Sequence, residues 1–423
     1  MKSANKWMAY FTWSLAVLFL FYEFFIRVFP TVMVQNLMES FSVTASNLGV
    51  LSACFFYAYA PMQIPVGLLM DYFGPRKLLT GASLLCGIGS FLFGLAQGLV
   101  MASIGRFLMG IGSACAFVGM VYVCSHMFSH KKRALLVGIG NSLGMLGAVG
   151  ATGPLTYSVN SFGWRATVNS FGFIGVFLAV VLYFFIRKQR ESHRSTTKQA
   201  STTLFRNLKM VCMNYKIWLN GVIALLTYMT TTAFASLWGI PFLMQSYGFS
   251  QELAGFIISM IFVGWIVGGP IVGMVSDRCN RRKPFLYICI ILTIFTLLPV
   301  LYISHLPISL LFVLLFFVGF FQSGELLNFS LAIEFNPIEL KGMSIAFTNF
   351  LIASGSSIVQ PLIGRFLDWG WDKSFQGGVP IYSLHNYHIA LLTLPVTLVL
   401  ALILLLFLQE KCKLMCCKTD ISS

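Results

Sequence analysis

Four charged residues stand inside long hydrophobic stretches of this sequence: Glu23, Arg27, Arg106 and Glu325. Glu23 and Arg27 are four residues apart, so on a helix they share one face, with the acid before the base. A buried arginine binds carboxylate or phosphate groups with its planar fork of N–H donors. A carboxyl group shielded from water takes up a proton more readily than one in solution. These residue types predict a binding site for a small charged molecule, combined with proton transfer by a carboxylate.

The balance of charges narrows the ligand class. Two acids and two arginines suit a zwitterion or a small monoanion better than a polyanion, which would need more cations. We expect Arg27 to hold a carboxylate with Glu23 beside it, and Glu325 or Glu23 to carry a proton or contact an amine. None of the six histidines lies deep in a hydrophobic stretch. Proton coupling would therefore fall to one of these two acids.

Two of these assignments leave an alternative open. A lone charge at the centre of a bilayer costs roughly 2.5–3.5 kcal/mol on insertion scales, so Glu23 and Arg27 also make sense as buried charges that satisfy each other. A pair kept only for stability gains little over apolar replacements, which favours a functional role. Arg106 fits a structural role and a substrate contact equally well.

Polar side chains accompany the charges. The stretch TYMTTTAFASLWG contains Tyr228 and Trp238, and FFQSGELLNFS contains Glu325 and Asn328, three residues apart on one helix face. We expect Tyr228, Trp238 and Asn328 to help bind the substrate, although threonines in spans commonly bond to their own helix backbone. The sequence has no CxxC pair and no histidine cluster, so neither a metal site nor a cofactor is expected.

The elements that must position these residues are membrane-spanning helices. Of the 423 residues, 57% are hydrophobic and 10% are charged, with a mean hydropathy of +0.83, whereas soluble domains carry about a quarter charged residues. A spanning helix needs about 20 apolar residues, and the chain lacks the alternating pattern of a membrane barrel. The twelve predicted spans cover 8–37, 44–70, 78–98, 101–127, 134–158, 166–186, 217–244, 252–275, 284–304, 307–333, 342–366 and 388–409.

Basic residues indicate how the spans are oriented. With the N-terminus in the cytoplasm, only Arg165, Arg365 and Lys373 fall on the outer side, Arg27 and Arg106 lie within spans, and the other Lys and Arg residues are cytoplasmic. This asymmetry follows the positive-inside rule. It also accounts for the net charge of +15, so nucleic acid is not an expected partner.

The two halves of the chain repeat each other. GLLMDYFGPRK follows the second span and GMVSDRCNRRK follows the eighth, so that Asp71 corresponds to Asp277. We expect an N-terminal six-helix bundle at 1–186, a cytoplasmic linker at 187–216, a C-terminal six-helix bundle at 217–409 and a cytoplasmic tail at 410–423. A tandem repeat of six spans is typical of transporters whose halves rock about a central site.

These motifs resemble those of the major facilitator superfamily. GLLMDYFGPRK is similar to the family's signature loop, Gly-x-Leu-Ala-Asp-Arg-x-Gly-Arg-Arg/Lys, and RFLMGIGSA is similar to its fourth-span motif. The resemblance implies an all-α membrane fold of twelve helices in two pseudo-symmetric six-helix bundles, with spans one, four, seven and ten lining a central cavity. It also implies that Asp71 and Asp277 stabilise the outward-facing state, with Arg76, Arg281 and Arg282 as neighbouring gate residues. The alternative is that these are solvated loop charges.

The sequence therefore predicts a proton-coupled importer of a small polar nutrient, in the first place an amino acid, that works by alternating access. YEFFIRV also resembles nutrient transporters of intracellular bacteria, including the phagosomal transporter family, which implies a bacterial inner membrane. The distribution of basic residues predicts that both termini are cytoplasmic. Two alternatives stay open: a transporter of a polycarboxylate siderophore in either direction, and a substrate-sensing receptor. A short linker and tail weigh against a receptor, and the lack of a Ser-His, Cys-His or metal constellation weighs against an enzyme. We expect a monomer whose partners are the substrate, a proton and membrane lipid.

Overall fold

The computed structural model describes residues 3–186, 197–279 and 281–410, and these residues form an almost entirely helical structure. The elements up to residue 186 are α1 (Ser3–Val28), η1 (Phe29–Val32), α2 (Val34–Phe41), α3 (Ala45–Met62), α4 (Val66–Gly94), α5 (Leu99–Met127), α6 (His130–Gly150), α7 (Gly153–Phe162) and α8 (Trp164–Phe185). The elements after residue 196 are α9 (Thr197–Cys212), α10 (Tyr215–Thr230), η2 (Thr231–Trp238), α11 (Gly239–Tyr247), α12 (Gln251–Cys279), α13 (Lys283–Tyr302), α14 (Ile308–Gln322), η3 (Ser323–Leu326), α15 (Leu327–Glu334), η4 (Ile338–Leu340), α16 (Lys341–Trp369), β1 (Phe375–Gln376), β2 (Val379–Pro380), α17 (Leu384–Leu391) and α18 (Thr393–Phe407).

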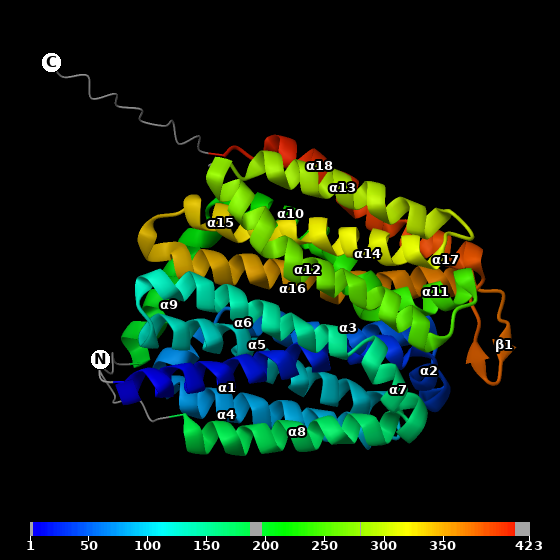
Figure 1. The fold of residues 1–423 in the computed structure, drawn as a ribbon, viewed down its shortest axis with the longest axis horizontal. Coiled ribbons are helices and arrows are strands. Elements are labelled where there is room, and N and C mark those ends of the chain that lie inside the picture. The colour runs from blue at the N-terminus through cyan, green and yellow to red at the C-terminus, as the bar shows by residue number, and fades with distance from the viewer. Residues whose placement is uncertain (1–2, 187–196, 280, 411–423) are drawn as a thin grey trace.

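The long helices run roughly parallel to one another in two groups. Figure 1 shows α1 to α8 on one side of the molecule and α10 to α18 on the other. Helix α9 lies at the end of the bundle where α1 begins, and the β1–β2 hairpin lies at the opposite end. We call these ends the linker face and the distal face. Helix α9 contacts α4, α10 and α16, so it touches both halves at the linker face.

The predicted spans are present as helices. Eleven segments of the described residues are long and apolar enough to cross a membrane. The twelfth candidate is the second predicted span, where α3 is joined to α2 across a bend of 111° and is followed by a turn at 63–65 before α4. The prediction of an all-α membrane protein with twelve spans in two six-helix bundles is therefore confirmed. Residues 187–196 of the predicted linker and 411–423 of the predicted tail lie outside the described residues.

A glycine separates the second span from the third. Gly74 has φ 72° and ψ 163° inside α4, a backbone conformation that only glycine adopts without strain. Pro75 follows it and starts the next helix with its fixed φ. The signature loop GLLMDYFGPRK therefore forms the reversal between two spans, as the sequence predicted.

Three of the spans that hold candidate site residues are interrupted. The first passes from α1 into the 3-10 turn η1, which contains Pro30, and the seventh contains the π-helical segment η2. The tenth passes through the 3-10 turn η3, which contains Glu325. Departures from regular α-helix are frequent at functional sites, and in transporters they free backbone groups near the substrate.

The two halves are held together mainly at the distal face. A Cβ on Gly364 would lie 2.3 Å from the carbonyl oxygen of Ala45, and one on Gly255 would lie 3.0 Å from Cα of Gly153, so helices from opposite halves touch backbone to backbone. A second group of glycines near the linker face meets no atom within 4 Å: Gly67, Gly138, Gly273 and Gly342. Small residues allow such close approach, and between the two halves the described glycines near the distal face use it, whereas these four do not.

Candidate functional site

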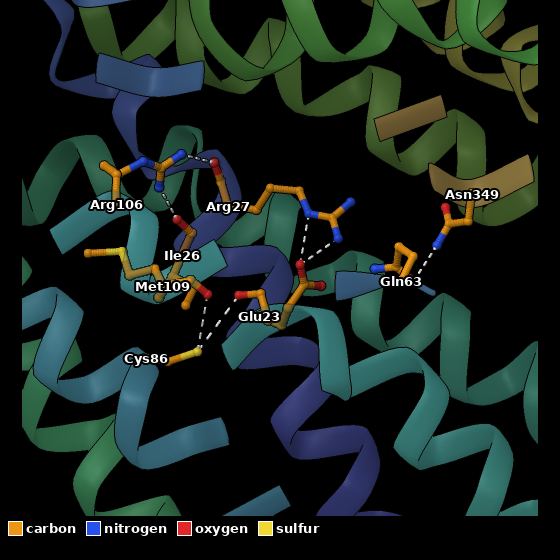
Figure 2. Close-up of polar contacts among 9 residues, drawn as sticks. Glu23, Ile26, Arg27, Gln63, Cys86, Arg106, Met109 and Asn349 are labelled. Carbon is orange, nitrogen blue, oxygen red and sulfur yellow. Dashed lines mark hydrogen bonds and ion pairs between the residues drawn. The ribbon is translucent and has the colours of Figure 1, made fainter. Parts of the chain in front are cut away.

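Arg27 and Glu23 form an ion pair on one face of α1 (Figure 2). Arg27 donates from Nε at 2.8 Å and from Nη2 at 2.5 Å, both to Oε1 of Glu23. Arg27 is 9% exposed and Glu23 is 1% exposed. Among the described residues, Nη1 of Arg27 makes no hydrogen bond. One edge of the guanidinium is thus occupied by Glu23, while its far end remains available to an anion.

Aromatic rings surround the Arg27 guanidinium. Its Cζ lies 4.7 Å from the ring centroid of Tyr59 and 4.9 Å from that of Phe24. Such contacts stabilise a buried cation without neutralising it. Tyr59 comes from α3, so the first and second spans together place the charge.

The C-terminal half contributes Tyr228, a predicted site residue. Tyr228 in α10 is partly buried and packs edge-on against Trp265 of α12 with ring centroids 5.8 Å apart. The indole N–H of Trp265 donates to Oγ1 of Thr231 at 3.1 Å, and Thr231 donates to Oε1 of Gln322 at 3.2 Å. This chain of hydrogen bonds fixes the Trp265 ring, against which Tyr228 packs. Tyr228 was predicted as a site residue, whereas Trp265 was not, because it stands alone among apolar residues in the sequence.

A hydrogen bond joins the halves beside this cluster. Nδ2 of Asn349 in α16 donates to Oε1 of Gln63 at 2.8 Å, and Gln63 lies one turn after Tyr59. Nε2 of Gln63 is buried and has no hydrogen-bond partner in the described part of the chain. Figure 2 shows both amides on the side of Arg27 away from Arg106.

Arg106 donates hydrogen bonds to backbone carbonyl groups of the first span. It is 0% exposed, and its Nη1 donates to the carbonyl oxygen of Ile26 at 2.7 Å while Nη2 donates to that of Arg27 at 3.3 Å. Figure 2 shows these bonds to the left of the Glu23–Arg27 ion pair. Of the two roles left open by the sequence, the contacts fit the structural one, and a substrate contact stays a prediction.

Trp238 does not join the Arg27 cluster in this structure. It ends the π-helical segment η2, is 0% exposed, and donates from its indole nitrogen to the carbonyl oxygen of Gln360 at 3.3 Å. Gln360 in turn donates to the carbonyl oxygen of Thr232 at 2.9 Å. These bonds satisfy backbone groups where the helix widens. The predicted substrate contact of Trp238 stays a prediction, and the structure adds no support to it.

Glu325 and Asn328 lie within the C-terminal bundle. Glu325 is 5% exposed, and its Oε1 has no hydrogen-bond partner among the described residues. It lines a small cavity, large enough for about one water molecule, together with Thr227, Cys289 and Thr293. Asn328 is 0% exposed and donates to the carbonyl oxygen of Glu325 at 3.0 Å. Both side chains therefore take part in packing of the tenth span.

The predicted gate residues lie near the linker face. Asp71 is exposed and makes no hydrogen bond within the described residues, and Cζ of Arg76 lies 4.3 Å from the ring centroid of Tyr183. In the second copy, Asp277 forms an ion pair with Arg282. The carbonyl oxygen of Arg281 accepts a 2.9 Å bond from Ser276, which also accepts one from Arg282. The two copies thus differ in their contacts in this conformation.

No group of three or more His, Cys, Asp or Glu side chains in the described ranges could hold a metal ion. The arrangement brings together the guanidinium of Arg27, aromatic rings, and amides from both halves. The chain matches the sequence profile of the Major Facilitator Superfamily over residues 14–360 and 221–412. It belongs to that superfamily. The chain is therefore an integral, multi-pass membrane protein of that superfamily.

Individual superfamily members are distant relatives. A probable sulfoacetate transporter of Cupriavidus necator is 26% identical over 60% of this chain and 62% of its own length. A probable L-galactonate transporter of Escherichia coli is 27% identical over 62% and 60%, and a probable galactarate/D-glucarate transporter of Bacillus subtilis is 24% identical over 78% and 79%. The chain thus spans about three fifths of the length of some of these relatives.

Solved structures share the superfamily fold. A bacterial homologue of the human lysosomal transporter Spinster, in its inward-facing and unoccupied conformation, superposes with a TM-score of 0.73 at 15% identity, covering 96% of both chains. The nucleoside transporter NupG superposes with a TM-score of 0.73 at 11% identity, covering 96% of this chain and 100% of that one.

Proposed function

We propose that this superfamily member is a secondary active transporter that takes up a small organic acid by alternating access, with Arg27 holding its carboxylate. The observation that carries the proposal is the half-occupied guanidinium of Arg27: Nε and Nη2 bind one oxygen of Glu23, and Nη1 makes no bond in the described residues. A planar fork with an open end fits a carboxylate. Relatives named for sulfoacetate, galactonate and glucarate transport support an organic acid as the cargo.

The sequence predicted an amino acid as the substrate, but an organic acid fits the site better. An amino acid needs an acceptor for its ammonium group as well as a partner for its carboxylate. Glu23 already receives both bonds from Arg27, and Glu325 lines a separate small cavity in the C-terminal bundle. The amides of Gln63 and Asn349 offer donors and acceptors instead, which suit hydroxyl groups. A polycarboxylate siderophore would call for more cations than the one with an open end.

Proton coupling and orientation complete the proposal. Glu325 is buried beside a cavity and lacks a partner for Oε1 among the described residues, and a carboxyl in such a place holds a proton without losing a salt bridge. The linker face carries most of the basic residues, which supports a cytoplasmic location for it. We propose a monomer in a bacterial inner membrane.

Transport by purified protein in liposomes tests the proposal. We expect labelled hydroxy-monocarboxylates to accumulate when the lumen is made alkaline, and amino acids and nucleosides not to compete. A matched panel of acids, amides and alcohols of the same carbon skeleton isolates the carboxylate. Equal competition by the amide would remove Arg27 from its assigned role. Ligand binding without flux would indicate a receptor.

A further inference from the structure

The first turn of α3 is capped by residues from the other half of the molecule. The N–H groups of a helix's first turn need acceptors, and Thr44 occupies the capping position with extended backbone without bonding to them through its own side chain. The acceptor is Asp368, at the distal end of α16. Its Oδ2 accepts from the backbone N–H of Ser46 at 2.9 Å, and its Oδ1 accepts from that of Ala45 at 3.2 Å.

Two hydroxyl groups complete this cap. Thr44 donates from Oγ1 to Oδ2 of Asp368 at 2.6 Å, and Tyr382 donates from its hydroxyl to Oδ1 at 2.6 Å. The Tyr382 oxygen also accepts from the N–H of Ala45 at 2.9 Å. Burial raises the pKa of Tyr382, so its hydroxyl stays a donor. Each carboxylate oxygen thus has two donors.

The cap sits where the halves are closest. Ala45 is 0% exposed and Tyr382 is 4% exposed, and the backbone of Gly364 in α16 approaches the carbonyl oxygen of Ala45, as described above. Negative charge at the start of a helix is further stabilised by the helix dipole. Separating α3 from α16 would break the four bonds that cross between the halves, and it would leave the bond between Tyr382 and Asp368, which lies within the C-terminal half.

We propose that Asp368 is a lock for the distal face: it caps α3 only while this face is closed, and releases it when the halves separate. The carboxylate is hydrated in the open state and rebinds the helix end once per cycle. This inference rests on the proposed alternating access, but it concerns a contact outside the substrate site. It sets the balance between the two conformers rather than the affinity for substrate.

Asparagine tests the lock because it keeps the shape and removes one acceptor oxygen. Its NH2 group would face two donors, so Asp368→Asn loses bonds to either the Thr44 and Ser46 pair or the Ala45 and Tyr382 pair. Asp372→Asn is the matched control. That acid lies four residues after Asp368, is exposed, accepts from Ser374 two residues later, and makes no hydrogen bond with the other half within the described residues.

A cysteine at position 31 reports opening of the distal face. Thr31 is 1% exposed and donates to the carbonyl oxygen of Leu237 across the halves at 3.4 Å. Labelling of Thr31→Cys by a membrane-impermeant maleimide is measured in intact membranes without substrate. Background labelling of the native cysteines is measured in the corresponding protein that keeps Thr31, and it is subtracted. We expect Asp368→Asn to raise the rate about tenfold, which corresponds to about 1.4 kcal/mol, and Asp372→Asn to leave it unchanged.

Each outcome decides the proposal. A parental labelling rate in folded Asp368→Asn overturns it, and so does an equal rise in Asp372→Asn, which would point to loop charge alone. If Asp368→Asn does not fold, Tyr382→Phe removes the hydroxyl that accepts from the N–H of Ala45 across the halves and should raise labelling by about threefold; a parental rate there overturns the lock. Because no substrate is present, a failed transport assay leaves this result standing, and the two proposals fail separately.

Discussion

The guanidinium of Arg106 donates a 2.7 Å hydrogen bond to the carbonyl oxygen of Ile26. In an unbroken helix that oxygen accepts from the backbone N–H four residues later, but that residue is Pro30, which has none. The fourth span therefore completes the hydrogen bonding of the first span, one residue before Arg27. Through this bond, Arg106 fixes the backbone from which the proposed substrate ligand projects.

Removing Arg106 should destabilise the protein, and the size of this loss of stability should depend on Pro30. Arg106→Ala leaves the carbonyls of Ile26 and Arg27 without their donor, at about 1–3 kcal/mol for each unsatisfied group, so the Tm in detergent should fall. Pro30→Ala restores the missing N–H and should recover part of the loss. We would measure unfolding of the parent, both single variants and the double variant as a cycle. Equal effects of Pro30→Ala in both backgrounds would contradict the pairing, and an unchanged Tm with lost binding would make Arg106 a substrate ligand.

Arg27→Lys tests whether substrate binding needs the planar guanidinium group of Arg27 or only its positive charge. Lysine keeps a cation beside Glu23 but cannot bind a carboxylate through two parallel bonds, so we expect at least about a tenfold rise in Kd with little change in Tm. Arg27→Ala should abolish binding, although it leaves Glu23 as an unpaired buried acid. The double variant Glu23→Gln, Arg27→Gln controls for that charge. Unchanged affinity in Arg27→Lys is the result that would count against the assignment, and isothermal titration of the purified protein measures it.

Glu325→Gln should uncouple transport from the proton gradient. Glutamine has the shape of the protonated acid but cannot release a proton, so the variant should exchange labelled for unlabelled substrate at the parental rate. Accumulation driven by a pH gradient should be lost in the same liposomes. Adding Asn328→Asp to the Glu325→Gln variant tests whether a different acid on the same helix face restores uptake driven by the pH gradient. Retained pH-driven uptake in Glu325→Gln would clear this residue of proton coupling.

Much of the fold follows from local sequence patterns. Apolar stretches of about 20 residues predict spans because lipid leaves the backbone no other way to satisfy its polar groups. The repeated loops around Asp71 and Asp277 predict two related halves, and Gly74 with Pro75 marks the reversal between spans. Each of these signals is contained in a short segment, so no knowledge of tertiary contacts is needed.

The site was only partly predictable, because its remaining contacts join distant segments. The i, i+4 spacing of Glu23 and Arg27 places them on one helix face, and the ion pair that the structure shows is one of the two alternatives left open by the sequence. The bond between Gln63 and Asn349 and the cap made by Asp368 cross more than 280 residues of sequence. Neither has a local pattern: Asp368 reads as an ordinary acid near a helix end, and its role depends on which half packs against it.

Asp71→Asn should slow turnover with little effect on affinity. In this conformation Asp71 is exposed and makes no bond with the described residues, whereas its counterpart Asp277 pairs with Arg282. A gate residue without partners while the distal face is closed is expected to form a hydrogen bond when the linker face closes, by accepting from a helix end or an arginine.

Loss of the Asp71 charge should therefore slow the return to the conformer in which the linker face is closed, by about threefold or more. Stopped-flow uptake measures this rate, and Kd is measured alongside it. Asp277→Asn is the matched comparison, since it removes the other predicted gate acid, which is already paired with Arg282 in this state. Normal turnover with lost affinity would refute the gate assignment. Asp71→Asn and Asp368→Asn destabilise opposite conformers, so the double variant should label at Thr31→Cys more slowly than Asp368→Asn alone.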